Sequence, residues 1–117
     1  FIIAHPEGYA LNPIITEGIE CMTDQEKAIK GADFIYTKNW CSYDHYGQIL
    51  KTDDQWMITP NKMELTNNGK FMHCLPIRRN IVATDGVLDS PRSLVIQQSQ
   101  NRIYSAQAVL KQLLENG

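Results

Sequence analysis

The sequence predicts an α/β fold in which a mainly parallel β-sheet is flanked by helices. Short apolar runs alternate with segments of helical pattern, which is the order of strand–helix–strand units. One run, ADFIYT at residues 32–37, is apolar enough to be buried on both faces, as central parallel strands are. The last segment carries an apolar stripe at helical spacing, which is typical of an amphipathic helix.

The predicted strands are short apolar runs bounded by turn residues, at residues 1–4, 18–22, 32–37 and 71–75. Thr23-Asp-Gln-Glu26 has the capping-box pattern, so a helix is expected from there to Gly31. Residues 60–68 predict a second helix, with Pro60 in its first turn. A third helix is expected from about residue 99 to 116, with one stripe formed by Ile103, Ala106, Val109, Leu110, Leu113 and Leu114.

Two stretches, residues 38–53 and 78–91, show no clear period and are expected to be irregular. Four short strands with so few covering helices indicate only part of an α/β domain. The chain also opens on Phe1 within an expected buried strand, so we expect it to be a segment of a longer protein.

Composition excludes several classes of protein. The 117 residues carry a net charge of −2, which gives no electrostatic footprint for nucleic acid or an anionic membrane. No apolar run is long enough to span a bilayer, and no signal peptide is visible. We therefore expect a cytoplasmic protein without nucleic-acid or membrane partners.

The cysteines indicate a reducing compartment. Cys21, Cys41 and Cys74 are an odd number without close pairs, unlike a secreted disulfide framework. The histidines and cysteines have no metal-ligand spacing, so no metal site is expected.

Polar segments follow three of the predicted strands. His5-Pro6-Glu7-Gly8, Lys38-Asn39-Trp40 and His73-Cys74-Leu75-Pro76 should converge at one sheet edge, where ligands bind in open α/β sheets. Ordinary loop polarity is the alternative for any one of them. The sequence has no GxGxxG, GxxxxGK[ST] or GxSxG motif, so a dinucleotide fingerprint, a phosphate loop and a hydrolase elbow are all unsupported.

Three types of side chain, within these segments or further along the chain, could carry chemistry. Neighbouring residues on a strand point to opposite faces, so His73 is poorly placed to deprotonate Cys74, and a buried or backbone role for the cysteine is favoured. Arg78 and Arg79 are suited to clamping a carboxylate or phosphate, or to a solvated surface. Arg102 near the start of the last helix is by itself an ordinary exposed helical arginine.

These segments together resemble the carbamoyltransferases. HCLPIRR at residues 73–79 is similar to the HCLPxRR segment of that family, and residues 88–95 followed by Asn101-Arg102 are similar to its closing segment. Lys38-Asn39-Trp40, with residues 5–9 and 46–50, resembles the branch that acts on N-succinylornithine and N-acetylornithine, where ornithine enzymes have a Ser-Met-Gly loop.

The resemblance implies a trimeric, two-domain enzyme of arginine biosynthesis without a cofactor, whose chain is knotted. Residues 1–98 would form part of the second, amino-acid-binding domain. Residues 99–117 would be the helix that packs toward the carbamoyl-phosphate domain. The partners implied are carbamoyl phosphate, an N-acylated ornithine and the remainder of the same enzyme.

The resemblance also assigns roles to single residues. Arg102 would stabilise the charge on the carbonyl oxygen of carbamoyl phosphate, and the backbone groups of Cys74 and Leu75 would orient its NH2 group. Lys38 and Arg78 would bind the acylornithine through carboxylates. For Arg79, His73, Trp40 and Glu7 a structural role is expected.

The sequence leaves the identity of the amine acceptor open. Related acetylornithine enzymes can carry a lysine where this chain has Val82, which favours the succinyl branch weakly. N-acetylornithine, free ornithine and a catalytically silent binding module with the same fold are the alternatives. A nucleotide-binding α/β domain is disfavoured, because the glycine-rich loop is missing.

Overall fold

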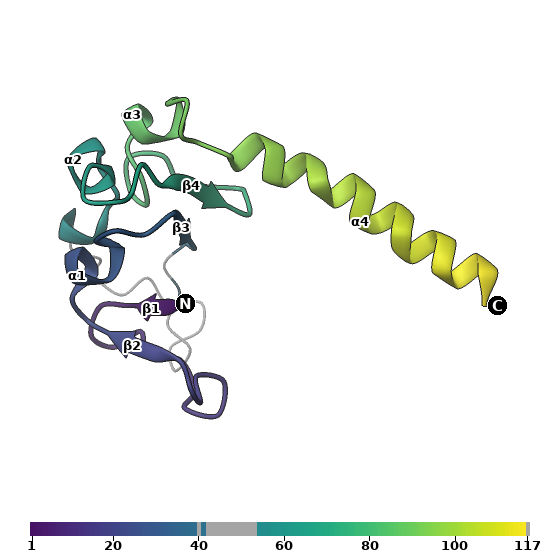
Figure 1. The fold of residues 1–117 in the computed structure, drawn as a ribbon, viewed down its shortest axis with the longest axis horizontal. Coiled ribbons are helices and arrows are strands. Elements are labelled where there is room, and N and C mark those ends of the chain that lie inside the picture. The colour runs from purple at the N-terminus through teal and green to yellow at the C-terminus, as the bar shows by residue number, and fades with distance from the viewer. Residues whose placement is uncertain (40, 42–53, 117) are drawn as a thin grey trace.

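Two parallel strand pairs form the framework of the computed structural model, which describes residues 1–39, 41 and 54–116. In the first pair, β1 (Ile2–Ala4) lies beside β2 (Glu20–Met22). In the second, β3 (Phe34–Thr37) lies beside β4 (Lys70–His73), in a register that aligns Thr37 with His73. Figure 1 shows the helices grouped around these pairs, apart from one long helix that projects away. The predicted α/β fold with parallel strands is confirmed.

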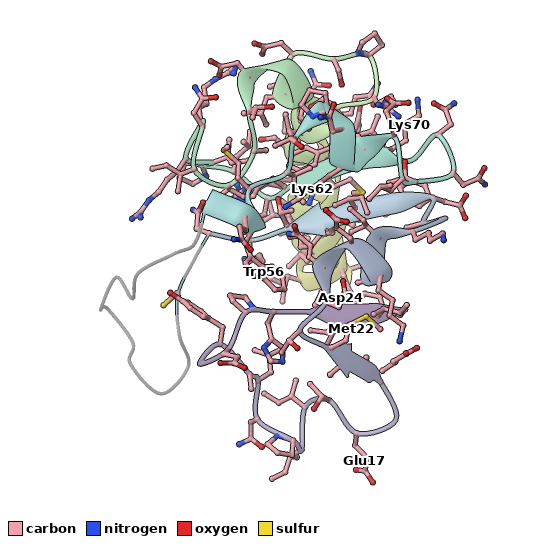
Figure 2. The ribbon with its side chains drawn as sticks, turned by 90° about the vertical axis from the view of Figure 1, so that its left-hand side faces the viewer. Glu17, Met22, Asp24, Trp56, Lys62 and Lys70 are labelled. Atoms are coloured by element: carbon pink, nitrogen blue, oxygen red, sulfur yellow. The ribbon has the colours of Figure 1, made fainter. Side chains whose placement is uncertain are left out.

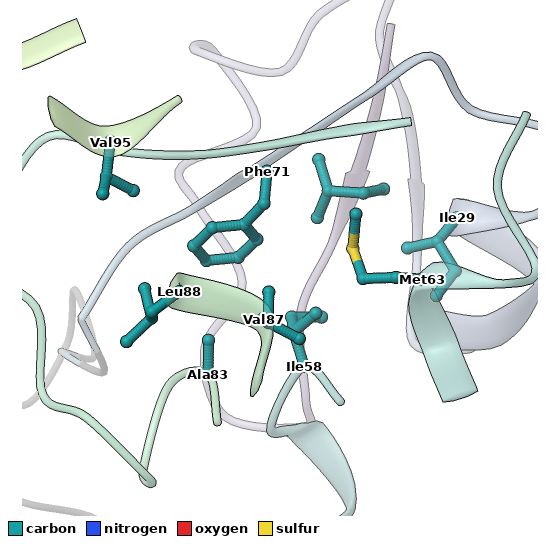
Figure 3. Packing of buried hydrophobic residues seen from close by; sticks show 9 residues of the cluster. Ile29, Ile58, Met63, Phe71, Ala83, Val87, Leu88 and Val95 are labelled. Atoms are coloured by element: carbon teal, nitrogen blue, oxygen red, sulfur yellow. The ribbon is translucent and has the colours of Figure 1, made fainter. Parts of the chain in front are cut away.

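The hydrophobic core is centred on Phe71 of β4, which is completely buried. Figure 3 shows its ring lying among the side chains of Val87, Leu88 and Val95. The remaining members of this cluster are Ile29, Ile35, Ile58, Met63 and Ala83. The backbone of Phe71 makes two further contacts, because its N–H donates to the carbonyl of Arg92 and its carbonyl accepts from the N–H of Leu94. These bonds fasten the approach to the last helix against β4.

Two short helices begin at polar caps. The first stops just before Gly31, which has a φ of 72°, as the sequence predicts, whereas the second ends earlier than predicted. In α1 (Gln25–Ile29) the carboxylate of Asp24, not Thr23, accepts from the N–H of Lys27 at 3.0 Å. In α2 (Pro60–Met63) Thr59 is the cap, and the helix stops well before residue 68.

The residues that follow α2 form a turn that leads into β4. The hydroxyl of Thr66 accepts from the N–H of Gly69 at 2.8 Å, and Asn68 has a φ of 49°. A Cβ at Gly69 would lie 2.7 Å from the carbonyl oxygen of Ala32. The chain therefore passes close to the backbone before β3 at Gly69, just after the residue at which the sequence predicts the helix to end, and enters β4.

The Lys62 ammonium links α2 to α1 and to the 3-10 turn at Asp54–Trp56. Its Nζ lies 2.5 Å from Oε1 of Gln25 and 3.1 Å from the carbonyl of Met57, and it also donates to the carbonyl of Gln55. Figure 2 shows Lys62 between the part of the chain that carries Asp24 and the part that carries Lys70.

The structure corrects three further expectations. α3 (Asp85–Leu88) lies in a stretch that was expected to be irregular, and its Val87 and Leu88 are core residues. α4 (Val95–Glu115) starts before residue 99, because Val95 is anchored in the core. On β3, Ile35 faces the core but Phe34 and Tyr36 are 62% and 51% exposed, so the strand is not buried on both faces.

α4 is largely exposed along its length. None of the residues that the structure describes covers its predicted apolar stripe. The exposed apolar side chains of this helix are Ile96, Ile103, Tyr104, Val109, Leu110, Leu113 and Leu114. In the part of the chain that the structure describes, no helix combines the length and apolarity needed to cross a membrane.

Replacing Phe71 by alanine should lower the free energy of unfolding by about 3–5 kcal/mol, because it leaves a cavity in the centre of the core. Urea unfolding followed by circular dichroism measures this. Phe71→Leu is the control, since it keeps most of the apolar volume and should cost clearly less. Equal midpoints for the wild type and Phe71→Ala would contradict the central place of this ring.

Candidate functional site

The ends of β3 and β4 lie side by side, as the register of the pair requires. Nζ of Lys38, just after β3, lies 3.4 Å from Sγ of Cys74, just after β4. One residue further on, Nδ2 of Asn39 donates to the carbonyl of Pro76 at 2.9 Å. Two of the three segments that the sequence singled out are therefore joined at one edge.

The third segment follows β1, which belongs to the other strand pair. There Nδ1 of His5 lies 2.9 Å from the carbonyl of Pro6, and the backbone N–H of His5 donates to the carbonyl of Met22. These contacts tie the segment to β2 and to itself. Trp40 lies outside the described residues.

A tight turn follows β4. Leu75 has a φ of 51°, in the left-handed region that residues with a side chain rarely adopt. Its N–H donates to Nδ1 of His73 at 2.9 Å, and the Leu75–Pro76 peptide is cis. The turn brings the backbone of Cys74 and Leu75 to the surface at the carboxyl end of the strand.

An open pocket of about 330 Å³ lies at this turn, lined by Cys74, Leu75, Gln98 and Arg102. Gln98 and Arg102 are four residues apart on α4, so they share one face of that helix. Three residues predicted from the sequence are thus brought together around one cavity. The physical link is the pair of Phe71 backbone bonds, which starts α4 next to β4.

Gln98 was missed by the sequence reasoning. Its Oε1 is enclosed and has no hydrogen-bond partner among the residues that the structure describes. The signal that could have found it is its helical spacing of four residues from Arg102.

Arg78, in contrast, does not line the pocket. It lies in an exposed stretch, and its carbonyl accepts from the N–H groups of Ile81 and Val82. The adjacent Arg79 is held in ion pairs with Asp85 at 2.7 Å and Asp89 at 2.5 Å. These pairs fasten the loop after β4 to α3.

The charges around the turn alter two protonation equilibria. Partial burial alone would raise the pKa of the Cys74 thiol, but hydrogen bonds from Lys38 and Tyr36 and the Lys38 charge outweigh it, so this pKa lies below its ordinary value. Burial, and then the charge of Lys38, lower the pKa of His73. Lys38 therefore shifts the Cys74 equilibrium toward its thiolate, and burial helps to keep the His73 imidazole neutral.

This arrangement suits the binding of an anionic, planar ligand. Arg102 and Lys38 supply cationic donors, and the turn supplies backbone groups, next to an open cavity. No group of three or more His, Cys, Asp or Glu that could hold a metal ion is found within residues 1–39, 41 and 54–116.

Comparisons with known proteins point to one family. Curated relatives include the N-succinylornithine carbamoyltransferase of Bacteroides fragilis, 54% identical over 99% of this chain and 37% of the relative. The N-acetylornithine carbamoyltransferase of Xanthomonas campestris pv. campestris is 38% identical over 78% of this chain and 29% of that protein. The chain thus spans 37% of the length of the first relative and 29% of the second.

Solved structures of N-acetyl-L-ornithine transcarbamylase have a similar fold. One crystal structure has a TM-score of 0.78 and 32% identity, covering 93% of this chain and 39% of the other. A mutant of that enzyme, complexed with carbamyl phosphate and N-succinyl-L-norvaline, has a TM-score of 0.77 and 31% identity over 93% and 38% of the two chains. Residues 5–113 match the aspartate/ornithine carbamoyltransferase Asp/Orn binding domain, and the chain belongs to this family.

Proposed function

We propose that the protein carrying this chain transfers the carbamoyl group of carbamoyl phosphate to the side-chain amine of N-succinyl-L-ornithine. The products are N-succinyl-L-citrulline and phosphate, and the reaction serves arginine biosynthesis. The observation that carries the proposal is the convergence of Arg102, Cys74 and Leu75 on one pocket. The 54% identity to an N-succinylornithine carbamoyltransferase favours succinylornithine as the acceptor.

In the proposed reaction the neutral amine attacks the carbonyl carbon, forming a C–N bond. Negative charge develops on the carbonyl oxygen, and the guanidinium of Arg102 stabilises it. The carbonyl then re-forms as the bond from carbon to the phosphate oxygen breaks, phosphate leaves with that electron pair, and the proton lost from the nitrogen passes to the leaving phosphate. Backbone groups of Cys74 and Leu75 hold the carbamoyl NH2, which favours a near-attack geometry.

The acylornithine would bind on the Lys38 side of the pocket. The ammonium of Lys38 lies 3.4 Å from the Cys74 sulfur and is exposed, so it can reach a carboxylate of the acceptor. Arg78 is the second proposed carboxylate ligand; its exposure leaves it open to ligand, although it lies outside the pocket lining. Val82 is buried and uncharged, which suits an acceptor that is not held by a cation at this position.

The remainder of the same protein is the proposed partner of α4. The exposed apolar stripe of this helix fits the expectation that residues 99–117 pack toward a carbamoyl-phosphate domain, whereas residues 1–98 form the amino-acid-binding part. By resemblance to the family we also propose a cytoplasmic homotrimer with a knotted chain.

The full-length protein should form acylcitrulline from carbamoyl phosphate and N-succinyl-L-ornithine, with a higher kcat/KM than with N-acetyl-L-ornithine or ornithine. Chromatography with mass spectrometry, run with each acceptor in turn, measures the product. Turnover with free ornithine alone would contradict the proposed acceptor.

Arg102→Ala should lower kcat by about a hundred- to a thousandfold, because it removes a donor aimed at the developing oxyanion. Lys111→Ala is the matched control, since Lys111 is a 74% exposed cation on the same helix. Steady-state kinetics compare the two variants. Undiminished turnover in Arg102→Ala would refute the proposed oxyanion role.

Lys38→Met should raise the pKa of Cys74, because it removes the ammonium that stabilises the thiolate. Fewer thiolates are then present at pH 7, so alkylation of Cys74 by iodoacetamide should slow. Peptide mass mapping over time measures the rate, with Lys30→Met as a charge-matched control away from the pocket. Equal rates in the two variants would contradict the Lys38–Cys74 pairing.

A further inference from the structure

His73 directly precedes Cys74 and Leu75, which line the pocket, and is only 1% exposed. Its Nδ1 lies 2.9 Å from the backbone nitrogen of Leu75. A backbone N–H can only donate, so Nδ1 must be the acceptor and carry no proton. The neutral ring therefore holds its proton on Nε2, a tautomer that is assigned here from the hydrogen bond.

The donor of this hydrogen bond is Leu75, which lines the pocket and has an unusual backbone conformation. Leu75 has a φ of 51°, and a leucine in this region needs support from its surroundings. The support that the structure gives its N–H is the His73 ring. Leu75 lines the cavity together with Cys74, Gln98 and Arg102, so a change in this turn would move the backbone groups that face the cavity.

We propose that His73 is a positioning residue for carbamoyl phosphate, in which the unprotonated Nδ1 holds the Leu75 turn and thereby aims the backbone groups of Cys74 and Leu75 at the carbamoyl NH2. This inference rests on the proposed function. It gives His73 a role through the turn, without contact with the substrate and without proton transfer to Cys74.

The surroundings of His73 keep Nδ1 available as an acceptor. Burial and the nearby Lys38 charge hold its pKa below the ordinary value, so the ring is neutral at pH 7. Nε2 is enclosed and has no hydrogen-bond partner in the described part of the chain. The bond to Leu75 is thus the polar contact that orients the ring.

Three substitutions in the full-length protein separate this role from simple packing. In His73→Asn the amide oxygen is attached to Cγ, as Nδ1 is, so it can still accept from Leu75. In His73→Gln the polar atoms lie one bond further out, and in His73→Leu the acceptor is absent while the bulk is retained.

We expect the KM for carbamoyl phosphate to rise by about tenfold or more in His73→Leu and His73→Gln, because the turn loses its acceptor. In His73→Asn the KM for carbamoyl phosphate should stay within about threefold of the wild-type value. In all three variants the KM for the acylornithine should change less than the KM for carbamoyl phosphate. A merely structural role would reduce thermal stability and the active fraction in His73→Leu and leave this KM unchanged, which would overturn the inference.

Nitrogen NMR of histidine-labelled full-length protein gives a second readout that needs no turnover. With His73→Asn used to assign its signals, the His73 ring should show an unprotonated Nδ1 and a protonated Nε2. A proton on Nδ1 would overturn the inference whatever the activity. Absence of carbamoyl-phosphate binding by calorimetry would instead overturn the proposed function, and the positioning role with it, even if the tautomer is as expected.

Discussion

Burial of Phe71 on the parallel pair of β3 and β4 is the central interaction of the hydrophobic core. Its ring fills the centre of the core, and its backbone bonds to Arg92 and Leu94 bring the start of α4 against β4. The register of the pair sets Thr37 beside His73, so the residues that follow each strand must meet. The contact between Lys38 and Cys74 is a direct consequence of this pairing.

The pocket is built from two chain segments that are positioned by different means. The Cys74–Leu75 turn is held from below by the buried imidazole of His73, whereas Arg102 is held by the direction of α4. Beyond this point α4 buries little of its apolar stripe against the described residues. Because Arg102 and the apolar stripe lie on the same helix, an element that packs on the stripe and moves the helix would also move Arg102 in the pocket.

Charge at the site is arranged around one ammonium. Lys38 stabilises the neighbouring thiolate form of Cys74 and at the same time disfavours protonation of His73. Both effects follow from placing a cation where two strand ends meet. The Lys38 cation thus lies at the exposed side of the site, whereas the buried ring beneath the turn is neutral.

The sequence by itself determined most strands and helices and the parallel α/β class, because periodicity and turn residues are local properties. The resemblance to the carbamoyltransferases singled out Arg102, Cys74 and Leu75, and the tertiary structure brings them to one pocket. Only the tertiary structure decided that Gln98 enters the pocket, that Arg78 stays outside its lining, that residues 85–88 form a helix and that one side of β3 is uncovered. Each of these depends on which distant residues pack together. The hydrophobic pattern of a sequence indicates that one face of an element is apolar. Which segment covers that face depends on contacts between residues far apart in the chain.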